Sequence, residues 1–311
     1  MVEQTAVEMG LADLGIMESD TLPINQLYVN YMEPPDAEQF PVVMVHGLTV
    51  SGKCYESQPD GRMGWAEYFV RNGYPAYVVD QVTRGRSGFN QAVYNNVRAG
   101  IAPPDSQPPF VRSGSNFVWV EFRIGTEPGV PFVDSQFPVD HIEDFLMRTV
   151  PCPFDYLDPN QTSRQLIQLA TELEGAVLLG HSESAMYPIE AAVLNPSAVK
   201  AAVVIEAENP DVTIFTDEQL AILGEVPILF VYGDHLDAEL FIPGGDWRVG
   251  FAKAQQFVER INALGGNAEI LFPPDLGIFG NSHMIMNDKN SDQIADLIMA
   301  WIQKNSVSIV S

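Results

Sequence analysis

Short hydrophobic runs without polar alternation recur along the chain, and each one ends at a turn signal. The first two lie at residues 42–45 and 76–79, with a helical pattern between them at 64–71 that ends at Asn72-Gly73. Uninterrupted apolar runs of this length are typical of central strands in a parallel sheet that is covered on both faces. A glycine after the helical pattern is a common helix end.

The same alternation returns after about residue 165. The pattern predicts strands at 176–179, 201–205, 228–232 and 268–272, and helices at 185–194, 249–264 and 293–303. Strands and helices that alternate at this spacing predict an α/β fold with a mostly parallel, doubly wound sheet.

Residues 89–163 break this alternation. The segment is rich in proline and carries scattered aromatic residues. It is too apolar for a linker, so we expect it to pack over an edge of the sheet as a cap. The expected organisation is a single domain over residues 1–311, with this irregular, aromatic-rich insertion at 89–163 and an N-terminal arm over residues 1–40.

Charge narrows the range of partners. The chain has 16 Lys and Arg against 41 Asp and Glu, which gives a net charge of −25. Such an acidic surface repels phosphate backbones and anionic lipids, so neither nucleic acid nor a membrane surface is an expected partner. No stretch approaches the length of a membrane span. The first ten residues lack the basic start of a signal peptide.

Motifs for cofactors and metals are missing from the sequence. It contains no P-loop, no G-x-G-x-x-G and no H-E-x-x-H, so no cofactor and no metal are expected. The two cysteines, Cys54 and Cys152, are too few for a disulfide framework and have no metal-ligand spacing. Whether they pair or stay free is open at this point.

The sharpest chemical signal is the stretch L-G-H-S-E-S-A at residues 179–185, which follows a predicted strand and opens a predicted helix. A serine between small residues in a strand–turn–helix is typical of a nucleophile elbow, because only small residues let strand and helix pass so closely. Ser182 is the predicted nucleophile and Gly180 the small residue before it. Ser184 stands where the usual G-x-S-x-G motif has its second glycine.

A serine nucleophile needs a base, and the chain has five histidines. His283 lies in a glycine-rich loop after the last predicted strand, where the chain order serine, acid, histidine puts the base. His46 ends the first strand, and we expect it to hold the loop that follows. His283 is therefore the predicted base.

Two carboxylates are candidates for the acid of the triad. Asp237 follows the strand where many such folds keep this group, whereas Glu206 ends the apolar strand before it. A carboxylate that closes an apolar strand is costly unless it has a partner. The pattern alone leaves both open.

Backbone N–H groups must stabilise the developing oxyanion. One is expected from Glu183, which follows the nucleophile, and the other from Leu48 in the loop after the first central strand. We expect aromatic residues to form the walls of the substrate pocket, namely Tyr55, Trp65 and, from the insertion, Trp119.

Several blocks of the sequence together resemble the α/β-hydrolase superfamily, and within it a small group of bacterial esterases. These blocks are His46-Gly47 with Gly52, residues 59–65 (P-D-G-R-M-G-W), Asp80-Gln81 with Gly85-Arg86-Ser87, His181-Ser182 with Ser184, and residues 280–284 (G-N-S-H-M). The group lacks the standard pentapeptide and cleaves esters on halogenated cyclic compounds. The resemblance runs from about residue 42 to residue 301.

The resemblance implies a role for each matching position. The nucleophile falls on Ser182, the base on His283 and the acid on Glu206, with Asp237 as the alternative. A homodimer and export to the periplasm are also implied, although a cytoplasmic protein would look the same. Leu48-Thr49 replaces a pair of adjacent cysteines, so the substrate preference is not carried over.

The sequence therefore predicts a serine carboxylesterase that hydrolyses neutral, apolar or cyclic esters through an acyl-enzyme. The alternatives are a lactonase, a thioesterase or a C–C bond hydrolase with the same triad, or a non-catalytic protein that binds a small molecule.

Overall fold

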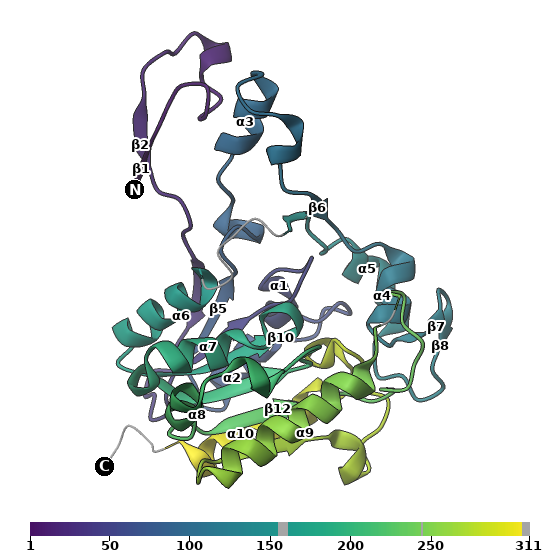
Figure 1. Cartoon of the computed structure of the whole chain (residues 1–311). Coiled ribbons are helices and arrows are strands. Elements are labelled where there is room, and N and C mark those ends of the chain that lie inside the picture. The colour runs from purple at the N-terminus through teal and green to yellow at the C-terminus, as the bar shows by residue number, and fades with distance from the viewer. Residues whose placement is uncertain (155–160, 244, 307–311) are drawn as a thin grey trace.

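The apolar runs form the parallel strands of one seven-stranded sheet at the centre of the molecule (Figure 1). The computed structural model describes residues 1–154, 161–243 and 245–306. The parallel strands are β4 (Val42–Val45), β5 (Ala76–Asp80), β10 (Ala176–His181), β11 (Val199–Ile205), β12 (Ile228–Val231) and β13 (Ala268–Leu271). Their order in the sheet is β13-β12-β11-β10-β4-β5, so the predicted doubly wound parallel sheet is confirmed.

The seventh strand, β3 (Tyr28–Met32), lies at the edge of the sheet and runs antiparallel to β5. The sequence analysis assigns these residues to an N-terminal arm, because a half-exposed edge strand lacks the continuous apolar run of its neighbours. Hydrogen bonds to β5, rather than burial of both faces, hold this segment in the sheet.

Helices cover both faces of the sheet, and each face has its own apolar core. α2 (Trp65–Arg71) and α10 (Ser291–Asn305) pack on one face. The other face carries α6 (Gln161–Glu172), α7 (Tyr187–Leu194), α8 (Asp217–Leu223) and α9 (Trp247–Ala263). A parallel sheet buried in this way exposes its functional groups at the carboxyl ends of its strands.

The insertion contains more regular structure than its proline content predicts. The α-helices and strands in its described residues 89–154 are α3 (Ala92–Arg98), β6 (Phe110–Val111), α4 (Ser115–Glu121), β7 (Gly125–Glu127), β8 (Val130–Pro131), α5 (Ile142–Leu146) and β9 (Cys152–Pro153). Phe122, Phe137 and Phe145 are buried in the same core as α2 and α10. The insertion therefore shares a core with the sheet instead of lying loosely on it.

The N-terminal hairpin and α3 project together from one end of the molecule (Figure 1). The hairpin pairs β1 (Val2–Gln4) with β2 (Asp20–Leu22). Hydrogen bonds from side-chain amides of α3 hold the hairpin segment in place. Asn95, for example, donates to the Glu8 carbonyl over 2.8 Å.

None of the helices in the described part of the chain is long and apolar enough to cross a membrane. Cys54 and Cys152 are both buried and free, so they do not form a disulfide with each other.

The side chain of Trp65 offers a test of the core beneath the sheet. It is 0% exposed and its indole N–H donates to the Ser291 carbonyl on α10. We expect Trp65→Ala to lower the free energy of unfolding by about 3–5 kcal/mol, because a large buried cavity is left behind. Urea denaturation measures the change. Met147→Ala, at a side chain that is 73% exposed, is the control and should change it by less than about 0.5 kcal/mol.

Candidate active site

Ser182 lies in the sharp turn after β10, in the strained conformation of a nucleophile elbow. Its backbone φ is +57°, a left-handed value that serine rarely adopts. Small residues surround this turn for steric reasons. A Cβ atom on Gly180 would lie 2.2 Å from the Ser184 carbonyl, and one on Gly47 would lie 2.7 Å from the Ser182 Cβ. Close packing thus holds the serine at the carboxyl end of the sheet.

Ser184 replaces the second glycine of the usual motif and supports the same turn. Its hydroxyl accepts a hydrogen bond from the His181 N–H and lies 3.0 Å from the Val45 carbonyl of β4. Ser184 does not have a positive φ, so this position does not require glycine. Serine is also small, and its hydroxyl hydrogen-bonds the turn to the neighbouring strand.

The structure brings Ser182, His283 and Glu206 together in one hydrogen-bonded row. His283 Nε2 lies 2.9 Å from Ser182 Oγ, and Nδ1 lies 2.8 Å from Glu206 Oε2. An ionised carboxylate only accepts hydrogen bonds, so Nδ1 carries the imidazole proton and Nε2 faces the serine as an acceptor. This arrangement lets the serine hydroxyl pass its proton to His283.

Glu206 is fully buried and also has a left-handed backbone, with φ at +56°. Burial raises the pKa of a carboxyl group, but here the Arg123 guanidinium and the hydrogen bond with His283 outweigh burial and lower the pKa of Glu206 to about 2. The Gly233 N–H adds a further hydrogen bond to Oε1. Glu206 is therefore an anion at neutral pH.

Asp237, the alternative acid, lies elsewhere. Its side chain is 73% exposed and forms an ion pair with Arg248 on α9. Because the loop after β12 turns this carboxylate to the surface, the structure places Glu206 and not Asp237 against His283.

Arg123 is a site residue that the sequence analysis missed. It comes from the insertion, is 0% exposed, and donates from Nη2 to both oxygens of Glu206 over 2.8 and 2.7 Å. The available signal was the cation at 123, which together with Glu121 interrupts an otherwise apolar stretch over residues 117–124, where a charge is costly without a partner.

A buried carboxylate, Asp288, holds the loop that carries His283. It accepts hydrogen bonds from the Ser282 N–H, the Ser282 hydroxyl and the Asn281 amide. Burial raises the pKa of Asp288 to about 7 despite these hydrogen bonds. Asp288, which lies beyond the block G-N-S-H-M, thus holds the loop in the conformation that presents the imidazole.

Two other histidines support the site without facing the serine hydroxyl. His46 donates from Nδ1 to the Gly47 carbonyl and accepts at Nε2 from the Gln81 N–H, so it holds the loop after β4 as predicted. His181 Nε2 lies 2.8 Å from the His283 carbonyl oxygen. Burial, together with the nearby His283, lowers the pKa of His181 to about 3. His181 therefore donates to that carbonyl as a neutral ring.

The two residues that the sequence predicts for the oxyanion hole, Leu48 and Glu183, lie in the loop after β4 and directly after Ser182. Among the residues that the structure describes, the Leu48 N–H has no acceptor. Glu183 is the second residue of a 3₁₀ turn over 182–184, so its N–H precedes the first acceptor within that turn. Arg84 fixes the side chain of Glu183 through an ion pair of 2.9 Å.

The three aromatic residues that the sequence assigns to the pocket wall are core residues instead. Tyr55 and Trp65 are 0% exposed, and Trp119 is 5% exposed. The Tyr55 hydroxyl donates to the Val45 carbonyl, and all three pack in the core on the α2 and α10 face. Aromatic residues fill the apolar interior first, so aromatic character alone does not locate a pocket.

A cavity of about 530 Å³ opens beside the oxyanion loop. Leu48 and Thr49 form one side of it, and the insertion and the loop before α9 form the rest. Its apolar lining residues are Leu48, Val111, Phe117, Phe154, Phe241 and Ile242. Glu121 accepts hydrogen bonds from the N–H groups of Phe241 and Ile242 and so fixes that part of the wall.

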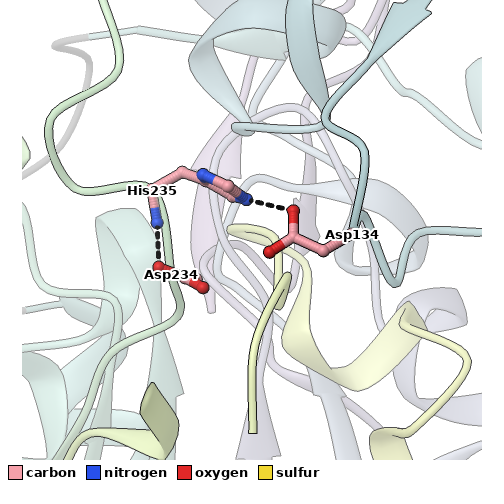
Figure 2. A group of neighbouring side chains, drawn as sticks. All are labelled: Asp134, Asp234 and His235. Carbon is pink, nitrogen blue, oxygen red and sulfur yellow. Dashed lines mark hydrogen bonds and ion pairs between the residues drawn. The ribbon is translucent and has the colours of Figure 1, made fainter.

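One group of side chains in the described part of the chain brings three potential metal-ligand atoms within 4.8 Å of one another: Asp134, Asp234 and His235 (Figure 2). Hydrogen bonds already engage these atoms. His235 Nε2 bonds to Asp134, while Asp234 accepts from the N–H groups of His235 and Gly280. These hydrogen bonds join the insertion to the loop after β12 and to the loop before His283.

Comparison with known proteins agrees with this geometry. The solved structure of a novel bacterial esterase matches with a TM-score of 0.89 and 36% identity, over 98% of this chain and 93% of the esterase. A probable secreted lipase from a fungal species (strain ATCC 74256) is 24% identical over an alignment 320 positions long, which covers 89% of this chain and 86% of the lipase. No model of a protein family matches the chain.

With this degree of identity over nearly its whole length, the chain belongs to the α/β-hydrolase superfamily, as its sequence blocks predict. It is an esterase- or lipase-like enzyme, a carboxylic ester hydrolase.

The raised pKa of Asp288 predicts a pH dependence of stability. A carboxyl group whose pKa rises from about 4 in the unfolded chain to about 7 in the fold binds more protons when folded. Its contribution to the free energy of unfolding is therefore complete below about pH 4 and is lost as the pH rises through 7. Urea unfolding at several pH values should show wild type losing stability relative to Asp288→Asn between these limits. The exposed Asp237→Asn serves as control, and a pH-independent difference for Asp288→Asn would contradict the prediction.

Proposed function

We propose that the chain is a serine carboxylesterase that hydrolyses neutral, apolar or cyclic esters through an acyl-enzyme on Ser182. The observation that carries the proposal is the unbroken row from Ser182 through His283 to Glu206, with bonds of 2.9 and 2.8 Å. Nucleophilic acyl transfer needs a serine, an imidazole that can take its proton, and an anion that stabilises the imidazolium. Ser182, His283 and Glu206 are arranged in this order.

In the first step, Ser182 Oγ attacks the ester carbonyl carbon and its proton passes to His283 Nε2. The imidazolium that forms lies between the serine and the Glu206 anion, which stabilises its charge and holds its orientation. His283 then gives the proton to the leaving alcohol oxygen as the ester C–O bond breaks. The acyl group stays on Ser182.

In the second step, water releases the acyl group. His283 Nε2 takes a proton from the water while the water oxygen attacks the acyl carbon. The proton then passes to Ser182 Oγ as the bond between Oγ and the acyl carbon breaks and the carboxylic acid leaves. In both steps the carbonyl oxygen becomes an oxyanion. The Leu48 and Glu183 N–H groups are the proposed donors to it, at a point where donors fixed in advance are effective.

The proposed substrate class follows from the lining and charge of the 530 Å³ cavity. Six of its twelve lining residues are apolar, Arg112 is the one charged lining residue, and the walls meet the loop after β4 at Leu48. A net charge of −25 disfavours an anionic substrate and favours departure of the carboxylate product. A neutral ester with an apolar or cyclic group fits both conditions.

Replacement of Ser182 tests the nucleophile. We expect Ser182→Ala to lower kcat for short p-nitrophenyl esters by at least about 10⁴-fold, because no acyl-enzyme can form. Ser197→Ala, at a serine whose hydroxyl bonds only locally to Asn195, is the control and should leave kcat unchanged. Equal activity in Ser182→Ala and wild type would refute the proposed function. A parallel screen of lactones and thioesters against the same variant defines the acyl donor.

Replacement of the two candidate acids tests the third member of the triad. Glu206→Gln removes the negative charge that stabilises the imidazolium, and we expect kcat to fall by about 10³–10⁴-fold. Asp237→Asn removes a carboxylate that pairs only with Arg248 in the described structure, and kcat should stay within twofold of wild type. The reverse pattern in the same ester assay would assign the acid to Asp237.

A further inference from the structure

The insertion reaches the row Ser182, His283, Glu206 through two consecutive residues, Phe122 and Arg123, which directly follow α4. The Phe122 carbonyl accepts a hydrogen bond of 2.9 Å from the His283 N–H, and the Phe122 ring lies 5.1 Å from the imidazole. Arg123 follows with a left-handed φ of +51°, and this turn directs its side chain toward Glu206. The insertion thus contacts both the base and the acid.

The guanidinium of Arg123 is held on several sides. Nη2 donates to both Glu206 oxygens, and Nε donates to the Asp234 carbonyl over 2.8 Å. The Trp247 ring packs against the guanidinium, with its centroid 4.6 Å away. These contacts join the insertion, the loop after β12 and the first turn of α9 around a single carboxylate.

A buried guanidinium in this position needs more than a structural reason. Its Nη1 has no hydrogen-bond partner in the described part of the chain, and its backbone is strained. An apolar side chain would avoid both costs, since buried ion pairs are often no more stabilising than apolar residues of similar volume. The feature that an apolar residue cannot supply is a positive charge on the acid of the triad.

We propose that Arg123 is a positioning residue of the active site, which keeps Glu206 ionised and orients its carboxylate toward His283. This inference rests on the proposed function, because it assigns Arg123 a role in the same reaction. In the row Arg123, Glu206, His283, the guanidinium bonds to both carboxylate oxygens, including Oε2, which also bonds to His283 Nδ1. The positive charge of Arg123 disfavours the uptake of a second proton by the pair Glu206 and His283, which already holds one proton on Nδ1.

Removal of the guanidinium changes how readily this pair takes up that second proton. Without Arg123, the carboxylate is a buried anion with one positively charged neighbour fewer, so a proton binds to the pair at higher pH, whichever of the two groups receives it. The other titratable residues that interact with the pair stay the same in every variant, namely His181, Glu121, Tyr232 and Asp288. A comparison of variants therefore isolates the charge of Arg123.

The test is the pH profile of kcat/KM for a short p-nitrophenyl ester, measured for wild type, Arg123→Met and Arg123→Lys. For Arg123→Met we expect the midpoint of the acid limb to move up by about one to two pH units. We expect kcat to fall by about 10–100-fold, as for other residues that orient a catalytic group, with KM nearly unchanged. Arg248→Met, which removes an exposed arginine, is the matched control for total charge and should reproduce the wild-type profile.

Arg123→Lys separates charge from geometry and also covers failure of Arg123→Met to fold. An ammonium group keeps the charge but cannot bridge Glu206 and Asp234, so the acid midpoint should stay at the wild-type value while kcat remains below wild type. An Arg123→Lys profile that matches wild type in both values overturns the positioning role. A midpoint that shifts in Arg123→Lys overturns the role of charge.

The outcomes distinguish this inference from the proposed function. If Arg123→Met folds and has lower activity but an unchanged acid midpoint, Arg123 is only structural and the inference is wrong, while activity that still depends on Ser182 leaves the proposed function intact. Absence of ester hydrolysis by wild type, or full activity of Ser182→Ala, refutes the proposed function instead.

Discussion

The charge of Glu206 is the constraint on which the rest of the site depends. This carboxylate lies at 0% exposure at the end of β11, where an unpaired anion would be costly. Three different parts of the chain compensate for its burial: Arg123 from the insertion, the Gly233 N–H after β12, and His283 from the C-terminal loop. The need to neutralise one buried charge therefore brings together segments that are far apart in the sequence.

Close packing at the carboxyl ends of the strands gives the site its geometry. Ser182 and Glu206 both have left-handed backbones immediately after neighbouring strands, which turns their side chains away from the strand direction. A Cβ atom on Gly47 would lie 2.7 Å from the Ser182 Cβ, and one on Gly233 would lie 2.7 Å from the Asn281 carbonyl, in the loop that carries His283. The turns at Ser182 and Glu206 therefore depend on the close packing of the loops that contain Gly47 and Gly233.

The insertion has two roles that its sequence does not separate. One part of it, including Val111 and Phe117, lines the cavity beside the oxyanion loop. Another part, residues 121–124, lies against His283 and Glu206 or fixes the loop before α9. The lining of this cavity and the contacts to His283 and Glu206 are consequently linked through one segment, which shares the apolar core of the sheet.

Local sequence was sufficient for features that local physics controls. Uninterrupted apolar runs predicted the central parallel strands, and the small residues around Ser182 predicted its turn, because both depend on neighbouring residues. His283 could be predicted from chain order. The choice of Glu206 over Asp237 needed a resemblance to known esterases, since both follow adjacent strands and nothing local shows which carboxylate faces the imidazole.

Other features depend on contacts between distant segments, and the tertiary structure alone decided them. The placement of Tyr55, Trp65 and Trp119 in the core, and not on a pocket wall, follows from which apolar surfaces meet when the sheet and helices pack. The pairing of Arg123 with Glu206 joins residues 83 positions apart. The sequence by itself determined the strands, the elbow and the residue types for ester hydrolysis. Only the fold decided which charges meet, because burial and electrostatic pairing are set by distances in space.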